Sequence, residues 1–256
     1  MLFRTKLVAA LAFALLSSPA LALNIVFEYD VSNSFFTEER IDAIERAGSV
    51  YENYITDDLD LVVTLMTTTD KGALAWGRSS FVIVTDKDGK VTTVPYSSKV
   101  TFSEDWDWYS GTDESFLGFD VFSVAIHELG HVFGIGASSA WINQVSGGYF
   151  YGENAVDIYG EPVPLALYDS HYIHWGVGVE STLPGTETWQ LPSYGPYATY
   201  GERIYLTDLD LAGLKDIGWD VSTVSSIPEP GTLYMLLSGL GIVGAVARRQ
   251  RTRTVI

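Results

Sequence analysis

Two histidines and a glutamate interrupt an apolar segment in the middle of the chain, in the order His127-Glu128-Leu129-Gly130-His131. Residues four positions apart lie on the same face of an α-helix, so a helix here would aim both imidazoles at one point. The preceding run Val121 to Ile126 supplies an apolar face for burial, and Asp120 is the predicted N-cap. The segment therefore requires a fold built around a central, buried helix.

The pattern H-E-x-x-H is typical of zinc sites. Glu128 lies about 100° around the helix from His127, which places its carboxylate beside the metal's water rather than on the metal itself. All four histidines of the chain fall between His127 and His174. This clustering favours a metal site over two core histidines that merely bond to backbone carbonyls. We expect His127 and His131 to bind zinc.

A catalytic zinc site needs a third protein ligand and one open position. Gly134 matches the longer pattern H-E-x-x-H-x-x-G-x-x-H, but Ala137 stands where the last histidine should be. Three candidates for the third ligand remain, namely Glu153, His171 and His174. An acid would follow the thermolysin pattern, which needs a second helix that the glycine-rich residues 147–152 do not predict. Both histidines are expected on a short loop.

Composition narrows the class of protein. The 256 residues include 15 basic and 32 acidic side chains, with a net charge of −17. Such a chain cannot neutralise a row of phosphates, which excludes nucleic acid as a partner. The absence of cysteine excludes a disulfide framework, a thiolate metal site and a cysteine nucleophile. The hydrophobic content of 47% is enough for one sizeable core.

Both ends of the chain are predicted to be export segments. Arg4 and Lys6 precede an apolar run, and Ala20-Leu21-Ala22 forms a cleavage site, so residues 1–22 predict a secretory signal peptide. At the other end, Ile227-Pro228-Glu229-Pro230-Gly231 precedes an apolar stretch and several arginines. That stretch, 233–247, is slightly shorter than the roughly 20 residues of a full membrane span. We expect a tail with a short transmembrane segment at 226–256.

Residues 23–225 predict a single α+β domain. Strands are expected at 24–29, 59–66, 81–85 and 90–95, with a helix that Thr37 caps between the first two. The central helix follows Asp120, and a short last helix spans Thr207 to Gly218. The C-terminal half between these two helices is expected to be rich in loops.

The tail resembles the PEP-CTERM sorting signal of Gram-negative bacteria, with its Pro-Glu-Pro motif, short hydrophobic helix and terminal arginines. The resemblance implies that an exosortase-type sorting enzyme cuts at the motif and that the tail enters the inner membrane transiently. It also implies export across the inner membrane to the cell surface, the extracellular matrix or the medium. A plain C-terminal membrane anchor is the alternative.

The central helix, His174-Trp175 and the segment Leu209 to Trp219 resemble the leishmanolysin-type branch of the metzincin zinc metalloproteases. In that branch an insertion separates the glycine from the third histidine, and the resemblance implies His174 as the third ligand. It also implies a metzincin-like fold, with a mixed twisted sheet and a central active-site helix. Metzincins place a methionine in a turn beneath the metal, but only Met1, Met66 and Met235 occur here. Another apolar residue would have to form that floor.

Two functions follow from these features. The first is a secreted zinc endopeptidase acting on a protein or peptide substrate, in which metal-activated water attacks the peptide carbonyl and Glu128 is the general base. The alternative is a non-catalytic PEP-CTERM matrix or surface protein with a structural metal site. Glu128 favours the endopeptidase, because a purely structural site has no use for a carboxylate at that position.

Overall fold

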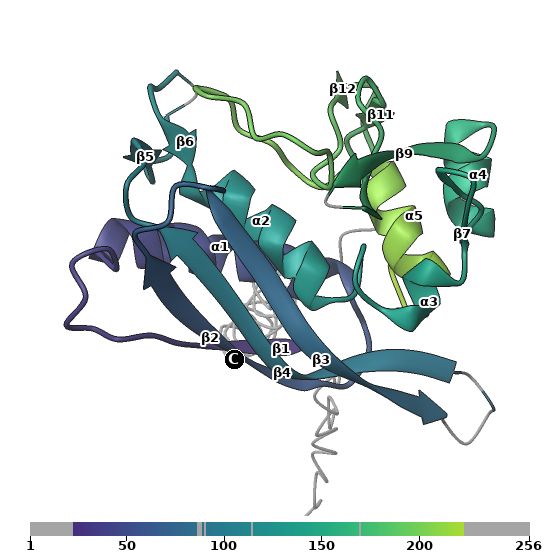
Figure 1. Ribbon diagram of the computed structural model, residues 1–256, viewed down its shortest axis with the longest axis horizontal. Helices are drawn as coiled ribbons and strands as arrows, with labels where there is room; N and C mark the ends of the chain where they lie inside the picture. The colour runs from purple at the N-terminus through teal and green to yellow at the C-terminus, as the bar shows by residue number, and fades with distance from the viewer. Residues whose placement is uncertain (1–22, 86–88, 90, 114, 169, 223–256) are drawn as a thin grey trace, which may run out of the picture.

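The computed structural model describes residues 23–85, 89, 91–113, 115–168 and 170–222 (Figure 1). The predicted signal peptide at 1–22 and the predicted tail at 226–256, with its short membrane span, lie outside these residues. Among the described residues, no helix has the length and apolar character needed to cross a bilayer. The fold is mixed α+β, as the sequence predicts.

A four-stranded mixed sheet forms the N-terminal part, in the order β1-β2-β4-β3. Its strands are β1 (Asn24–Glu28), β2 (Asp60–Thr68), β3 (Ala75–Thr85) and β4 (Val91–Ser103). β1, β2 and β4 run parallel, whereas β3 is antiparallel to β4. β3 is therefore an edge strand that pairs with a strand of this sheet on one side only.

Strands β3 and β4 are longer than the sequence predicts. β3 starts at Ala75 instead of Phe81, and β4 continues to Ser103 instead of ending at Pro95. The added part of β3 contains Gly77 and polar residues, which have low strand propensity by themselves. Pairing along the hairpin stabilises this part of the strand despite its low propensity, since every residue of β3 has a partner in β4.

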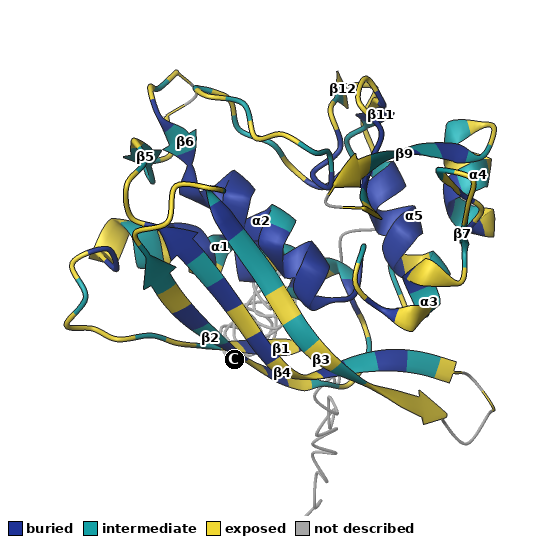
Figure 2. Ribbon diagram, viewed as in Figure 1, coloured by how far each residue is buried: buried dark blue, intermediate teal, exposed yellow. Residues whose placement is uncertain are grey.

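Two helices connect this sheet to the rest of the fold. The first, α1 (Glu38–Tyr54), is capped by Thr37, whose side chain accepts from the Arg40 N–H, as predicted. The second, α2 (Val121–Val132), is capped by Asp120, also as predicted, and is buried along nearly its whole length (Figure 2). It packs against α1 and against β3 and β4. The helix that carries the H-E-x-x-H motif thus lies in the core, between the sheet and the C-terminal part (Figure 1).

Short elements make up the C-terminal part. The helices are α3 (Ser139–Ile142), α4 (Glu153–Tyr159) and α5 (Asp208–Asp216). A second sheet has the order β10-β9-β8-β7, from β7 (Val145–Ser146), β8 (Tyr149–Phe150), β9 (Val163–Tyr168) and β10 (His171–Trp175). Two small strand pairs lie outside both sheets: β5 (Trp108–Tyr109) pairs with β6 (Phe119–Asp120) just before α2, and β11 (Ser181–Thr182) pairs with β12 (Trp189–Gln190) in the C-terminal part.

The prediction that His171 and His174 lie on a short loop is wrong, because both belong to β10. This strand pairs antiparallel with β9, and its last residue, Trp175, is fully buried against Trp141 and Phe150. The aromatic packing fixes the end of β10, and with it the position of His174.

Candidate metal centre and active-site cleft

Three histidine side chains converge at the C-terminal half of α2. His127 and His131 come from one face of the helix, and His174 comes from β10, 43 residues beyond His131. Their Nε2 atoms form a nearly equilateral triangle with sides of 3.1 Å, 3.2 Å and 3.2 Å. No other group of three or more potential metal-ligand side chains comes together within the described part of the chain.

Hydrogen bonds at the outer nitrogens orient two of these rings. The Nδ1 atom of His127 lies 2.7 Å from the Ser193 carbonyl oxygen, and that of His131 lies 2.8 Å from the Ile135 carbonyl oxygen. A carbonyl only accepts, so each Nδ1 carries the proton and each Nε2 offers a lone pair to the centre. The Nδ1 of His174 is buried and has no partner among the described residues.

The histidines are neutral at physiological pH. Burial lowers the pKa of His127 to about 3 and that of His174 to about 2, and it also lowers the pKa of His131. The His131 imidazole adds to this effect at His127, and both His127 and His131 add to it at His174, because a second positive charge nearby would be unfavourable. Neutral imidazoles are the form that binds a metal ion.

The three nitrogens fit a zinc ion. Zinc binds histidine nitrogen at about 2.0–2.1 Å, and tetrahedral angles would separate three such ligands by about 3.3–3.4 Å. The observed separations of 3.1–3.2 Å are close to this value. The cluster offers three potential protein ligands, which would leave the fourth position of a tetrahedral ion open, as in catalytic rather than closed structural sites.

The other two candidates for the third ligand lie elsewhere. His171 is at the opposite end of β10 and is exposed, whereas Glu153 is the first residue of α4. Neither belongs to the group that surrounds the potential metal position. The structure therefore brings His174 to His127 and His131, and it does not bring His171 or Glu153 there.

Glu128 lines the same cleft as the three histidines and is only 5% exposed. The main-chain N–H of Gly77, on edge strand β3, donates to its Oε2 atom. Burial raises the pKa of Glu128 to about 8, although the bond from Gly77 acts in the opposite direction. A dication at the histidines would lower this pKa, because it stabilises the charged carboxylate.

Sequence reasoning missed Gly77. A Cβ atom at this position would overlap the main-chain carbonyl of Glu128, so only glycine lets the edge strand approach the helix this closely. A single glycine inside a strand pattern is a known signal of close backbone approach. Gly77 carries this signal, but the sequence pattern predicts a strand only from Phe81 onward, and Gly77 lies before it.

The cleft that contains these groups has a volume of about 690 Å³. Residues 72–78, at the start of β3 and just before it, line this cleft, and so does much of segment 191–204. Several aromatic side chains line it as well, namely Trp76, Trp106, Phe119, Tyr168 and Tyr197. The histidines and Glu128 thus face a space that is large enough for part of a polypeptide.

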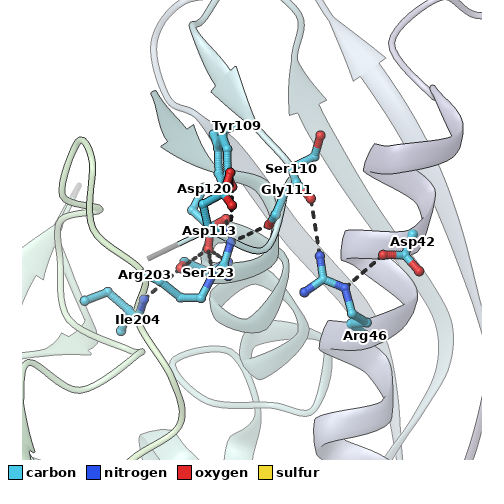
Figure 3. A network of polar contacts seen from close by, with 10 residues as sticks. All are labelled: Asp42, Arg46, Tyr109, Ser110, Gly111, Asp113, Asp120, Ser123, Arg203 and Ile204. Carbon is cyan, nitrogen blue, oxygen red and sulfur yellow. Dashed lines mark hydrogen bonds and ion pairs between the residues drawn. The ribbon is translucent and has the colours of Figure 1, made fainter. Parts of the chain in front are cut away.

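A buried ion pair anchors the far end of segment 191–204 to α2 (Figure 3). Arg203 donates from Nε to Oδ2 of Asp120 at 2.9 Å and from Nη2 to Oδ1 at 2.8 Å. Its Nη2 also donates to the Gly111 carbonyl at 2.7 Å. Asp120 is the N-cap of α2, and it accepts from both the N–H and the hydroxyl of Ser123. One wall of the cleft is therefore fixed to the start of the helix that carries the motif.

Two protein-family models match parts of the chain. Residues 85–144 match the family model described as matrixin, a zinc metalloprotease family, and residues 226–251 match the PEP-CTERM protein-sorting motif. The matrixin match contains His127, Glu128 and His131 and ends before His174. No curated protein matches the chain. These findings support a zinc metallopeptidase that is exported and recognised by an exosortase-type enzyme.

Proposed function

We propose that the chain is an exported zinc endopeptidase in which His127, His131 and His174 bind the metal and Glu128 is the general base. The observation that carries this proposal is the convergence of three Nε2 atoms in a cleft that Glu128 also lines. The site has three ligands instead of four, which suits catalysis better than a structural role.

In this mechanism the residues of the chain have separate tasks. Zinc, when bound, supplies a Lewis acid that polarises the scissile carbonyl and lowers the pKa of water. Glu128 accepts a proton from the attacking water and then delivers it to the departing amine nitrogen. The Gly77 N–H holds the Glu128 carboxylate in place during both transfers. The Ser193 and Ile135 carbonyls keep His127 and His131 in the metal-binding tautomer.

An extended peptide is the substrate that the cleft fits best. Edge strand β3 borders the cleft and pairs within its sheet with β4 alone. A peptide can add to such an edge through main-chain hydrogen bonds, which hold it without regard to its sequence. The aromatic residues of the cleft would then contact its apolar side chains.

We further propose that the chain belongs to the leishmanolysin-type branch. The supporting observations are Gly134, whose φ of 109° ends α2 in a left-handed turn, and the insertion that separates it from His174. The proposed division is a signal peptide at 1–22, the catalytic domain at 23–225 and a PEP-CTERM tail at 226–256. An exosortase would cut at Pro228-Glu229-Pro230 and release the domain outside the inner membrane.

The test is zinc content and casein hydrolysis by the exported protein, for wild type and Glu128→Gln. The variant should keep one zinc per chain and lose about 10² to 10⁴ in rate, because it lacks the proton acceptor. Glu161→Gln is the matched control, since Glu161 is exposed and lies outside the cleft. A wild-type protein that binds zinc and hydrolyses no peptide would favour the non-catalytic surface protein instead.

A further inference from the structure

Tyr194 is fully buried and packs on the motif itself. A Cβ atom added at Gly130 would overlap three carbon atoms of the Tyr194 ring, Cδ1, Cε1 and Cζ. The ring therefore occupies the space next to the helix at Gly130, the residue before His131. This contact explains why glycine stands inside α2, where it costs about 1 kcal/mol of helix stability relative to alanine.

The Tyr194 hydroxyl reaches the same helix through a second buried tyrosine. Tyr51, on α1, donates its hydroxyl proton to the Ile126 carbonyl at 2.6 Å, since a carbonyl only accepts. The Tyr194 hydroxyl lies 3.0 Å from the Tyr51 oxygen and must therefore donate to it. Burial raises the pKa of both phenols well above the ordinary value, which keeps both protons in place. Ile126 directly precedes His127.

The main chain at Tyr194 makes the third connection. Its carbonyl accepts from the Trp175 N–H at 2.9 Å, and Trp175 directly follows His174. The preceding carbonyl, that of Ser193, accepts from Nδ1 of His127. The buried carboxylate of Asp210 accepts from the N–H groups of both Ser193 and Tyr194, at 2.8 Å and 3.3 Å. Tyr194 thus contacts, directly or through Tyr51, a chain neighbour of each of the three histidines.

We propose that Tyr194 is the positioning residue that sets the spacing of the three histidines, in the role that a methionine turn has in metzincins. Met66, the methionine within the described residues, is on β2 and is 44% exposed, so it cannot fill this role. The ring of Tyr194 is the essential part, because the three atoms nearest to the space over Gly130 all belong to it. This inference rests on the proposed function only in that the histidines bind zinc.

The experiment measures zinc affinity by chelator competition, together with the visible absorption of the cobalt-substituted protein, on the full exported chain. Tyr194→Leu should weaken zinc binding by about 10- to 100-fold, as is typical when a group that orients metal ligands is lost. Tyr194→Phe keeps the ring and should restore most of the affinity and the wild-type cobalt spectrum. The matched control is Phe35→Leu, since Phe35 is also buried but packs against Phe102 and Trp108.

A second variant tests the same contact from the helix side. Gly130→Ala introduces a methyl group against the Tyr194 ring, and in the otherwise wild-type protein this single change should weaken zinc binding. In the Tyr194→Leu background the same change should cost less, because the ring is gone. If Tyr194→Leu does not fold, Gly130→Ala decides the question, and unchanged zinc affinity in that variant overturns the proposal.

The outcomes separate this inference from the proposed function. The positioning role is overturned if Tyr194→Leu folds, keeps the wild-type zinc affinity and loses as much melting temperature as Phe35→Leu. Tyr194 would then stabilise the core without positioning the histidines. A wild-type protein that binds no zinc would instead overturn the proposed function. A weakened Leu variant that Phe rescues supports the positioning role.

Discussion

The ion pair between Arg203 and Asp120 should be one of the strongest single polar contributions to stability. The Asp120 side chain is completely buried and that of Arg203 is 12% exposed. Removing one partner of such a pair costs about 3–5 kcal/mol, because it leaves a buried charge uncompensated. Asp120 keeps its two bonds from Ser123, so we expect the lower end of this range for Arg203→Ala.

The assay is denaturant unfolding of the metal-loaded protein, with Arg46→Ala as the matched control (Figure 3). Arg46 pairs with Asp42 one helical turn away, at 2.9 Å, and donates to the Ser110 carbonyl at 3.3 Å, but the two charged side chains are 33% and 65% exposed. Such exposed pairs contribute about 0.3–0.5 kcal/mol. A loss of about 3 kcal/mol lowers the melting temperature of a domain of this size by about 6–12 °C. Equal losses in the two variants would refute the reasoning.

Three further predictions concern the metal and the tail. His174→Ala should weaken zinc binding by orders of magnitude in chelator titrations, whereas His171→Ala should leave it unchanged; the reverse order would make His171 the ligand. The metal-free protein should lose stability as pH falls from about 6.5 toward 3. In this range the histidines of the unfolded chain bind protons, whereas His127 and His174 of the folded chain stay neutral because burial lowers their pKa. Glu128 has the opposite effect, because its raised pKa makes its contribution to stability fall as pH rises toward about 8. Below pH 6 the effect of three histidines outweighs that of one glutamate. A melting temperature that rises on acidification would contradict this prediction. Deleting Arg248 to Arg253 should impair retention or processing, since these charges fix the orientation of the tail, and an intact C-terminus on freely secreted protein in mass spectrometry would exclude cleavage at the motif.

The helix with the motif could be predicted because its signals are local. Asp120 as the cap, the apolar run after it and the histidine spacing all act within a few turns of chain, and α2 has these features. The same holds for α1, with its Thr37 cap. Gly134 likewise has the left-handed conformation that the pattern implies.

The rest of the site depends on contacts between distant segments. Pro162 and Pro164 favour a loop before His174, but the pairing of β9 with both β8 and β10 overrides that preference. Only the family resemblance distinguishes His174 from His171 and Glu153, because no local signal in the sequence brings β10 to α2. Tyr194 is one of 15 tyrosines, and nothing in its neighbouring residues distinguishes it. Its role depends on Gly130 and Tyr51, both far away in the sequence.

The most direct test of the account is the anomalous scattering of a zinc-loaded crystal at the zinc absorption edge. We predict one strong peak per chain at about 2.0–2.1 Å from the Nε2 atoms of His127, His131 and His174, with a non-protein ligand in the fourth position. Glu128 should lie beside this position without binding the metal. A peak bound by Glu128, His171 or Glu153, or no peak at the three histidines, would contradict the account.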